Sequence, residues 1–290
     1  MRLVPAVLLI ATLAGRAGAD PTPVDIELVL MVDVSRSMGP AEVRTQRRGY
    51  ADALASDEVV EAIVNSGIGA VGLTYIEWGS HDFQRVILPW TLIDSKASAR
   101  GAARRLEEDF RVSMRQLHDT PYHLRQTSIS GAISHGQKEL ERNEYEGLRK
   151  VIDISGDGPN NDGDPVTQSR DIALAADIIV NGLPLITAGA GMDPETENLN
   201  LYFAECVIGG PGAFVLAVQG WSDLRLAVRH KLLLEMAENP DNIWQTEGIL
   251  GRKGRDVDCL IGEKSRQVRE SERLGRKAGD SLPRSSADAP

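Results

Sequence analysis

An almost unbroken apolar run over residues 26–34 is the feature that most constrains what this chain can fold into. The run contains Asp33 near its end and is followed by Ser35 and Ser37. A segment this apolar is typical of a strand buried on both faces, as in the middle of a parallel sheet. Such a strand has little room for polar side chains along its length, and in open α/β sheets ligands bind at the carboxyl ends of the strands. One carboxylate and two hydroxyls at this end offer the oxygen ligands that suit a hard divalent cation.

Composition narrows the classes of function. The chain has 290 residues, of which 42% are hydrophobic and 26% charged, so it is long enough for one large globular domain or two small ones. Its formal net charge of −10 argues against a nucleic-acid partner, because phosphate backbones bind basic patches. Aromatic residues make up only 4% of the chain, so we expect a mainly aliphatic core.

Residues 1–19 have the pattern of a secretory signal peptide. A weakly positive start precedes an apolar stretch at residues 4–14, and the small residues Ala17 and Ala19 fit a cleavage site. The apolar stretch is shorter than the roughly 20 residues that span a bilayer, although an uncleaved anchor is the alternative. We expect cleavage after Ala19 and a mature chain, residues 20–290, that is periplasmic or secreted and has no membrane span.

The chain has two cysteines, Cys206 and Cys259, and both lie in the expected mature part. In an oxidising compartment an even pair favours a disulfide, which would tie the C-terminal segment to the main domain. Two unpaired thiols are the alternative, because the sequence gives no geometry.

Apolar runs alternate with helix-like segments along the chain, which predicts a doubly wound, mostly parallel α/β sheet of six strands flanked by helices. The second and third strands follow each other too closely for a crossover helix, so we expect an antiparallel hairpin and one antiparallel edge strand. The pattern fades near residue 239. We therefore expect a domain over residues 20–238 and a C-terminal extension over 239–290 that is partly disordered or a frayed helix. Strands are expected at residues 25–34, 70–78, 83–90, 150–155, 183–188 and 213–218. Helices are expected at residues 39–55, 57–65, 94–110, 128–142, 165–180, 194–206 and 223–236.

Two further oxygen-bearing residues should reach the end of the first strand. Thr127 opens the helix that precedes the fourth strand, and Asp157 follows that strand. The first and fourth strands are expected to be neighbours where the sheet reverses direction, so their loops can converge.

These residues resemble the metal-ion-dependent adhesion site of the von Willebrand factor type A domain, and the resemblance covers about residues 24–237. The family pattern is Asp-x-Ser-x-Ser, a Thr ahead of a helix, and Asp-Gly after a strand. The matching positions are Asp33, Ser35, Ser37, Thr127 and Asp157. The resemblance implies a Rossmann-like fold and a divalent cation that the Ser and Thr hydroxyls touch, with the acids acting directly or through water. Shorter stretches also resemble a bacterial family of exported type A-like proteins without an established activity, namely residues 74–78, 84–90, 154–158 and 208–214.

The ion expected here is Mg²⁺, with Mn²⁺ or Ca²⁺ as alternatives, because Mg²⁺ prefers six oxygen ligands and keeps some of its waters. A carboxylate from a protein partner can then replace one water. We therefore expect an exported, metal-dependent protein-binding module and not an enzyme. The alternative is a metal-assisted, phosphatase-like hydrolase. Against it, the chain has no second acid two residues after Asp33, no Gly-x-Ser-x-Gly elbow and no His placed to serve Ser35 or Ser37 as a base.

Some residues have competing interpretations. Ser35 and Ser37 could merely cap the helix after Gly39. Asp153 lies within a predicted strand, where it is either a paired structural acid or a group that orients the metal ligands. A further hypothesis is that the helix at residues 223–236 shifts with ligand state and that a disulfide restrains it. Four residues near the hairpin either shape partner recognition or belong to a solvated hairpin with its Trp in the core, and they are Glu77, Trp78, His81 and Asp82.

Overall fold

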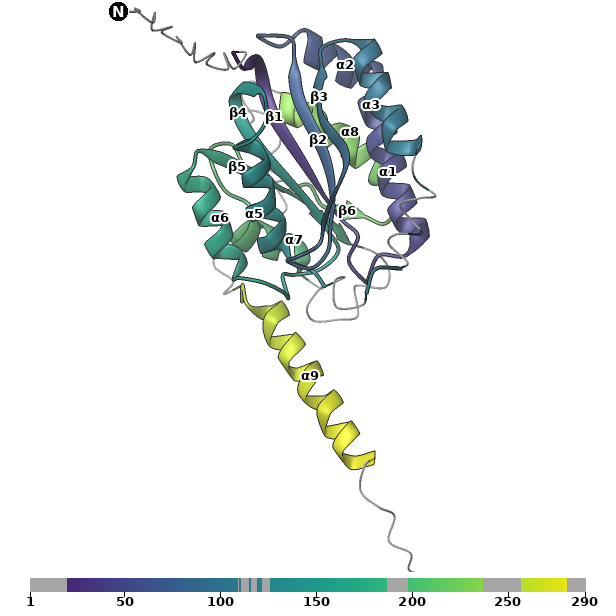
Figure 1. Ribbon diagram of the computed structural model, residues 1–290, viewed down its shortest axis with the longest axis vertical. Helices are drawn as coiled ribbons and strands as arrows, with labels where there is room; N and C mark the ends of the chain where they lie inside the picture. The colour runs from purple at the N-terminus through teal and green to yellow at the C-terminus, as the bar shows by residue number, and fades with distance from the viewer. Residues whose placement is uncertain are drawn as a thin grey trace, which may run out of the picture.

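A six-stranded sheet with helices on both faces forms the body of the molecule (Figure 1). The computed structural model describes residues 20–108, 110, 115, 119–121, 126–186, 198–236 and 257–280, with side chains to residue 272. The expected signal peptide and most of residues 111–126 lie outside the described residues.

The sheet has the order β3-β2-β1-β4-β5-β6, and only β3 runs antiparallel to its neighbour. This arrangement confirms the predicted fold class, a doubly wound sheet with one antiparallel edge strand. β1 lies between β2 and β4, where the direction of winding reverses, as predicted. The strands are β1 (Thr22–Asp33), β2 (Val71–Trp78), β3 (Gln84–Ile93), β4 (Tyr145–Gly156), β5 (Ile178–Ile186) and β6 (Val218–Gln219).

Helices cover both faces because β1 alternates its apolar side chains between two cores. Leu28 and Leu30 pack into the core beneath α1, α2, α3 and α8, whereas Val29 and Met31 pack into the core beneath α5, α6 and α7. The helices of the first face are α1 (Pro40–Leu54), α2 (Asp57–Val64), α3 (Lys96–Glu108) and α8 (Leu224–Met236). Those of the second face are α5 (Ile129–Leu140), α6 (Val166–Ala175), α7 (Leu199–Tyr202) and the π-helical turn Phe203–Val207.

The sixth strand is shorter than predicted. The sequence favoured a strand at residues 213–218, but β6 contains only Val218 and Gln219, and a single bridge joins Val215 to Gly182. Gly210 and Gly212 have φ angles of 99° and 72°, so the chain turns here instead of running straight beside β5.

A long helix, α9 (Ile261–Asp280), lies in the C-terminal extension, for which we expect a partly disordered segment or a frayed helix. It leaves the body near the lower edge of the sheet and points away from it (Figure 1). Cys206 and Cys259 are disulfide-bonded, with 5.6 Å between their Cα atoms, so the start of α9 is tied to the end of the π-helical turn. The disulfide prediction is thus confirmed. Within the described residues, no helix is both long and apolar enough to cross a membrane.

Candidate metal centre

The end of β1 folds back on itself and gathers three oxygen-bearing side chains. Asp33 is fully buried, and its Oδ1 accepts a 2.6 Å hydrogen bond from the Ser35 amide. The hydroxyls of Ser35 and Ser37 lie 3.1 Å apart. Helix α1 begins only at Pro40, and the amide of its N-cap, Gly39, donates to Glu42 at 2.6 Å. The two serines therefore do not cap α1, which removes the alternative interpretation of this motif.

The loop after β4 brings a second acid to the same place. Asp157 Oδ1 accepts a 2.7 Å hydrogen bond from the Ser37 hydroxyl, and the Asp157 amide lies 3.4 Å from Asp33 Oδ2. Gly156 permits this approach, because a Cβ there would lie 3.2 Å from Asp33 Oδ2. Four of the five predicted ligands are thus joined in one hydrogen-bonded group.

Thr127 is linked to this group through the loop that follows β4. Its amide donates to Asn161 Oδ1 at 3.0 Å, and the Asn161 amide donates back to the Thr127 carbonyl at 2.8 Å. Thr127 directly precedes Ser128, whose side chain caps α5 by accepting from the Gly131 amide. The start of α5 and the Asp157 loop are therefore held together by a pair of hydrogen bonds.

The electrostatics of the site favour a cation. Burial raises the pKa of Asp33 well above its ordinary value, and the negative charge of Asp157 raises it further, while the Ser35 hydrogen bonds oppose this. Burial also raises the pKa of Asp157, against the hydrogen bond from Ser37. Neither acid forms one of the ion pairs found among the described residues. Two crowded carboxylates beside hydroxyls fit a hard divalent ion, which would neutralise both.

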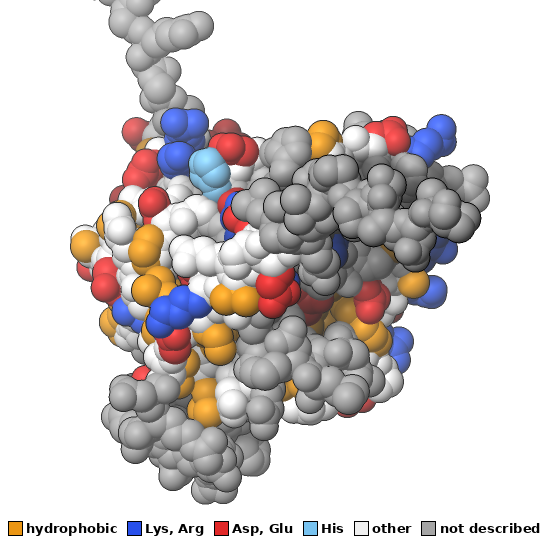
Figure 2. Space-filling view, turned by 90° about the horizontal axis from the view of Figure 1, so that it is seen from below, with side chains coloured by type: hydrophobic (Ala, Val, Ile, Leu, Met, Phe, Trp, Pro, Cys, Tyr) orange, Lys and Arg blue, Asp and Glu red, His pale blue; other side chains and the backbone are white. Residues whose placement is uncertain are grey.

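The oxygen-rich character of the site also sets the kind of metal that it suits. The described part of the chain holds no group of three or more His, Cys, Asp or Glu residues arranged to bind a metal ion. The candidate ligands are instead two carboxylates and three hydroxyls, a donor set typical of Mg²⁺, Mn²⁺ or Ca²⁺. In the view from below, acidic and basic side chains are interspersed over the described surface (Figure 2).

Asp153 has its charged partner on α8 and not at the metal centre. Its Oδ1 lies 3.1 Å from Lys231 Nζ, and the same ammonium lies 3.3 Å from Glu235 Oε1. Asn181 donates to both carboxylate oxygens of Glu235. Burial raises the pKa of Asp153 to about 7, although Lys231 lowers it. These contacts fit the interpretation of Asp153 as a paired structural acid that joins β4 to α8.

The hairpin residues have a structural arrangement that the sequence did not predict. Glu77 is fully buried and accepts a 2.6 Å hydrogen bond from Arg47 Nε, and it also pairs with Arg85. Trp78 is completely buried in the core, as the solvated-hairpin interpretation expected, but the burial of Glu77 differs from that interpretation. The burial of Arg47 could have been predicted from the sequence, because Arg47 lies between Val43 and Tyr50 on the apolar side of a predicted helix.

The first turns of α9 contact the loop that carries Asp157, which no sequence pattern indicated. Asn160 Nδ2 donates to Glu263 Oε1 at 2.7 Å. Arg266 Nη1 donates to Asp162 Oδ1 at 2.6 Å and to the Asn161 carbonyl at 3.0 Å. Asn161 is also hydrogen-bonded to Thr127. The contacts of α9 therefore support the backbone near two candidate ligands, Thr127 and Asp157.

Comparisons with known proteins identify the family of this chain and its type of fold. A family described as "Protein of unknown function (DUF1194)" matches residues 23–240, and the chain belongs to it. No curated protein matches the chain by sequence. The fold is that of von Willebrand factor type A domains.

Several solved structures are similar to this chain at low sequence identity. Proximal thread matrix protein 1 from the mussel byssus is 14% identical with a TM-score of 0.50, over 75% of this chain and 49% of that one. The same protein with a zinc-occupied MIDAS motif has a TM-score of 0.46 at 13% identity, over 75% and 49% of the two chains. The pilus adhesin SpaC from Lactobacillus rhamnosus GG has a TM-score of 0.49 at 13% identity, over 75% and 31%. The chain thus spans half or less of the length of these proteins.

Proposed function

We propose that this protein is an exported, metal-dependent protein-binding module. A divalent cation, Mg²⁺ in the first instance, would be held by Asp33, Ser35, Ser37, Thr127 and Asp157. The observation that carries the proposal is the hydrogen-bonded group formed by the first three of these residues and Asp157, in which two raised-pKa carboxylates lack a basic partner among the described residues.

The role of the cation would be to bridge to the partner. Hydroxyl ligands bring no negative charge, so an ion held by two carboxylates and three hydroxyls stays electrophilic. An acidic side chain of a protein partner would then replace a water on the ion. The residues of this chain would supply the rigid, buried support, since Asp33 ends a strand that is bonded on both sides.

The cellular setting is part of the same proposal. Residues 1–19 would be a signal peptide cleaved after Ala19, which would place the module over residues 20–238 in the periplasm or outside the cell. A disulfide between Cys206 and Cys259 is consistent with an oxidising compartment.

Affinity capture from native envelope extract tests the function. The immobilised protein should retain a partner in the presence of Mg²⁺ and release it on addition of EDTA. Asp33→Ala and Ser35→Ala should abolish this EDTA-sensitive capture, whereas Ser222→Ala, an exposed serine on another loop, should not. Equal recovery of the same partner with Mg²⁺ and with EDTA would contradict the proposal. Metal-dependent hydrolysis of phosphomonoesters that is lost in Asp33→Ala would replace it with the hydrolase alternative.

A further inference from the structure

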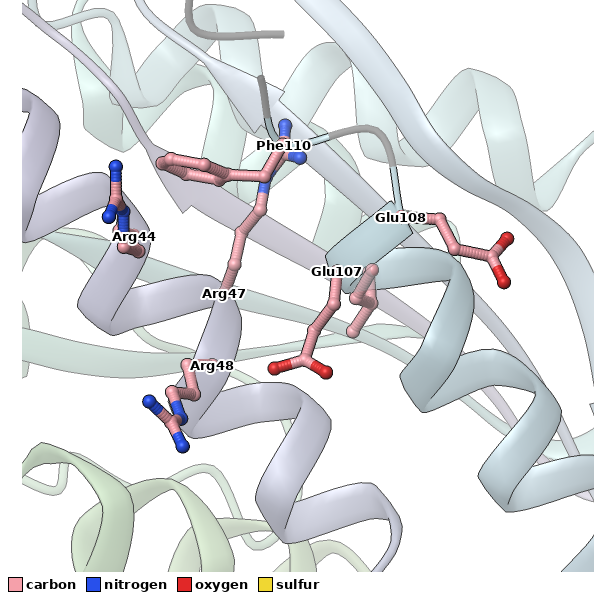
Figure 3. Close-up of a pocket in the computed structure, with 7 residues that line it drawn as sticks. Arg44, Arg47, Arg48, Glu107, Glu108 and Phe110 are labelled. Atoms are coloured by element: carbon pink, nitrogen blue, oxygen red, sulfur yellow. The ribbon is translucent and has the colours of Figure 1, made fainter. Parts of the chain in front are cut away.

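A pocket of about 420 Å³ lies between α1 and the end of α3 (Figure 3). Three of its lining residues, Arg44, Arg47 and Arg48, come from α1, and their spacing places them on one side of the helix. The remaining lining residues are Leu106, Glu107, Glu108 and Phe110. None of these residues belongs to the candidate metal centre.

Arg47 has hydrogen-bond donors that no described residue of the protein accepts. Its side chain is only 2% exposed, and its Nε donates to Glu77. Its two terminal nitrogens are buried and have no hydrogen-bond partner within the described part of the chain. Because buried donors are nearly always paired in native proteins, two unpaired nitrogens on one guanidinium indicate a missing acceptor.

The surrounding charges make that acceptor an anion. The buried carboxylate of Glu77 pairs with both Arg47 and Arg85, so Arg47 does not have this acid to itself. Arg44 adds a further positive charge at the pocket. In Figure 3 the carboxylate of Glu108 points away from the three arginines, while Glu107 lies on their side of the pocket.

The geometry points to a carboxylate-binding pocket at Arg47 that works without the metal ion. The paired terminal nitrogens of a guanidinium match the two oxygens of a carboxylate, which accept two parallel hydrogen bonds. The Phe110 ring lies 4.8 Å from Arg44 Cζ and 5.5 Å from Arg47 Cζ, so it offers a flat apolar surface to the stem of the ligand. The ligand class is a monoanionic carboxylate on a short apolar or aromatic stem.

Two features of the pocket define how such a ligand binds. The terminal nitrogens of Arg47 are enclosed, so a ligand reaches them only when the side chains around them move. Glu107 disfavours a dianion such as phosphate, because a second negative charge would lie close to its carboxylate. The pocket does not depend on the proposed metal-dependent function.

The test is a ¹⁹F NMR titration of the full chain with 4-fluorophenylacetate in EDTA. We expect saturable binding that Mg²⁺ does not change, and no binding of the neutral analogue 2-(4-fluorophenyl)ethanol. Inorganic phosphate at equal concentration should not displace the probe. Absence of saturable binding, dependence on Mg²⁺, or displacement by phosphate would each overturn the inference. Since the titration is done in EDTA, its failure leaves the metal-dependent function untouched.

Variants locate the binding to this pocket. Arg47→Lys keeps the positive charge but removes the paired terminal nitrogens that bind both carboxylate oxygens. Arg44→Ala removes a positive charge from the lining of the pocket. Each variant should weaken binding by about tenfold. Arg104→Ala, an exposed arginine of α3 outside the pocket, should leave the affinity unchanged. Glu107→Gln should strengthen binding, and it remains decisive if Arg47→Lys does not fold. Unchanged affinity in both Arg44→Ala and Glu107→Gln would overturn the assignment.

Discussion

The Ser37 hydroxyl donates a 2.7 Å hydrogen bond to Asp157 and so joins two loops that are 120 residues apart in the chain. The first loop follows β1 and the second follows β4. Their meeting at the reversal point of the sheet creates the candidate metal centre.

Asp157→Asn is expected to have opposite effects on the metal-free and the metal-bound protein. Removing one of two crowded negative charges should raise the melting temperature measured in EDTA, because Asp33 loses a repulsive neighbour. The same change should lower the affinity for Mg²⁺ by about tenfold or more, because a charged ligand is lost. Thermal melts and calorimetric titration with MgCl₂ measure both effects. Ser222→Ala is the control, and a Mg²⁺ affinity that Asp157→Asn leaves unchanged would contradict the assigned site.

The buried acid Asp153 should make the stability of the protein fall as the pH rises. Burial raises its pKa from 3.8 to about 7, so between these values the folded state holds a proton that the unfolded state has released. The contribution of Asp153 is therefore fully present below pH 4 and is lost as the pH rises towards 7. Tyr50, Lys231 and Glu235 are the titratable groups near it.

Asp153→Asn tests this pH dependence, because the amide side chain of asparagine does not titrate in this pH range. Denaturation in urea between pH 5 and pH 8 should show that the variant gains stability relative to wild type as the pH rises. A single proton corresponds to a slope of at most about 1.4 kcal/mol per pH unit. Asp82→Asn, on the exposed hairpin, is the control. Parallel stability profiles for wild type and Asp153→Asn would refute the prediction.

Glu77→Gln is expected to destabilise the protein by about 3–5 kcal/mol, because it leaves the buried Arg47 without its charged partner. The matched control is Glu58→Gln, since the ion pair of Glu58 with Arg229 is exposed and should contribute only about 0–1 kcal/mol. Equilibrium unfolding in urea measures the two differences. Similar small losses in both variants would show that the buried pair is not needed for stability.

Gly262→Ala should separate α9 from the loop that carries Asp157. A methyl group at this position would overlap the carbonyl oxygen of Asn160, which is backbone and cannot move aside freely. We expect hydrogen exchange at residues 160–162 to become faster and the Mg²⁺ affinity to fall several-fold, while the disulfide keeps α9 attached. Gly101→Ala is the control, because a Cβ there meets nothing within 4 Å. Exchange rates equal to those of wild type would show that α9 does not brace the loop.

The sequence predicted a mostly parallel sheet with one antiparallel edge strand, and β1 beside β4, because apolar spacing marks the buried strands and connection length separates hairpins from crossovers. β1 was recognisable from its apolar run, which the structure buries on both faces of the sheet. β6 was predicted too long, because apolar residues also fill a loop that turns at glycines. The ligand pattern could be proposed because each residue follows or precedes an identifiable element.

The partners of the buried charges could not be predicted in the same way. Asp153 and Arg47 each lie at positions where an apolar residue is expected, so the sequence indicates that each needs a partner. Which residue provides it depends on how α8 and β2 are placed in space, and the partners, Lys231 and Glu77, are distant in the chain. The contact of Arg266 with Asp162 could not be predicted either. The periodicity of α9 does not indicate which part of the domain the helix contacts.

The direction of the strands determines how the protein should be tethered in a capture experiment. β1 begins at Thr22, at the opposite end of the domain from the candidate metal centre, whereas the first turns of α9 contact the loop beside that centre (Figure 1). A solid support coupled ahead of Thr22 leaves the lower face open to solution. A support or a bulky fusion coupled after Asp280 would lie on the same side as the candidate metal centre and would compete for space with the partner that we propose.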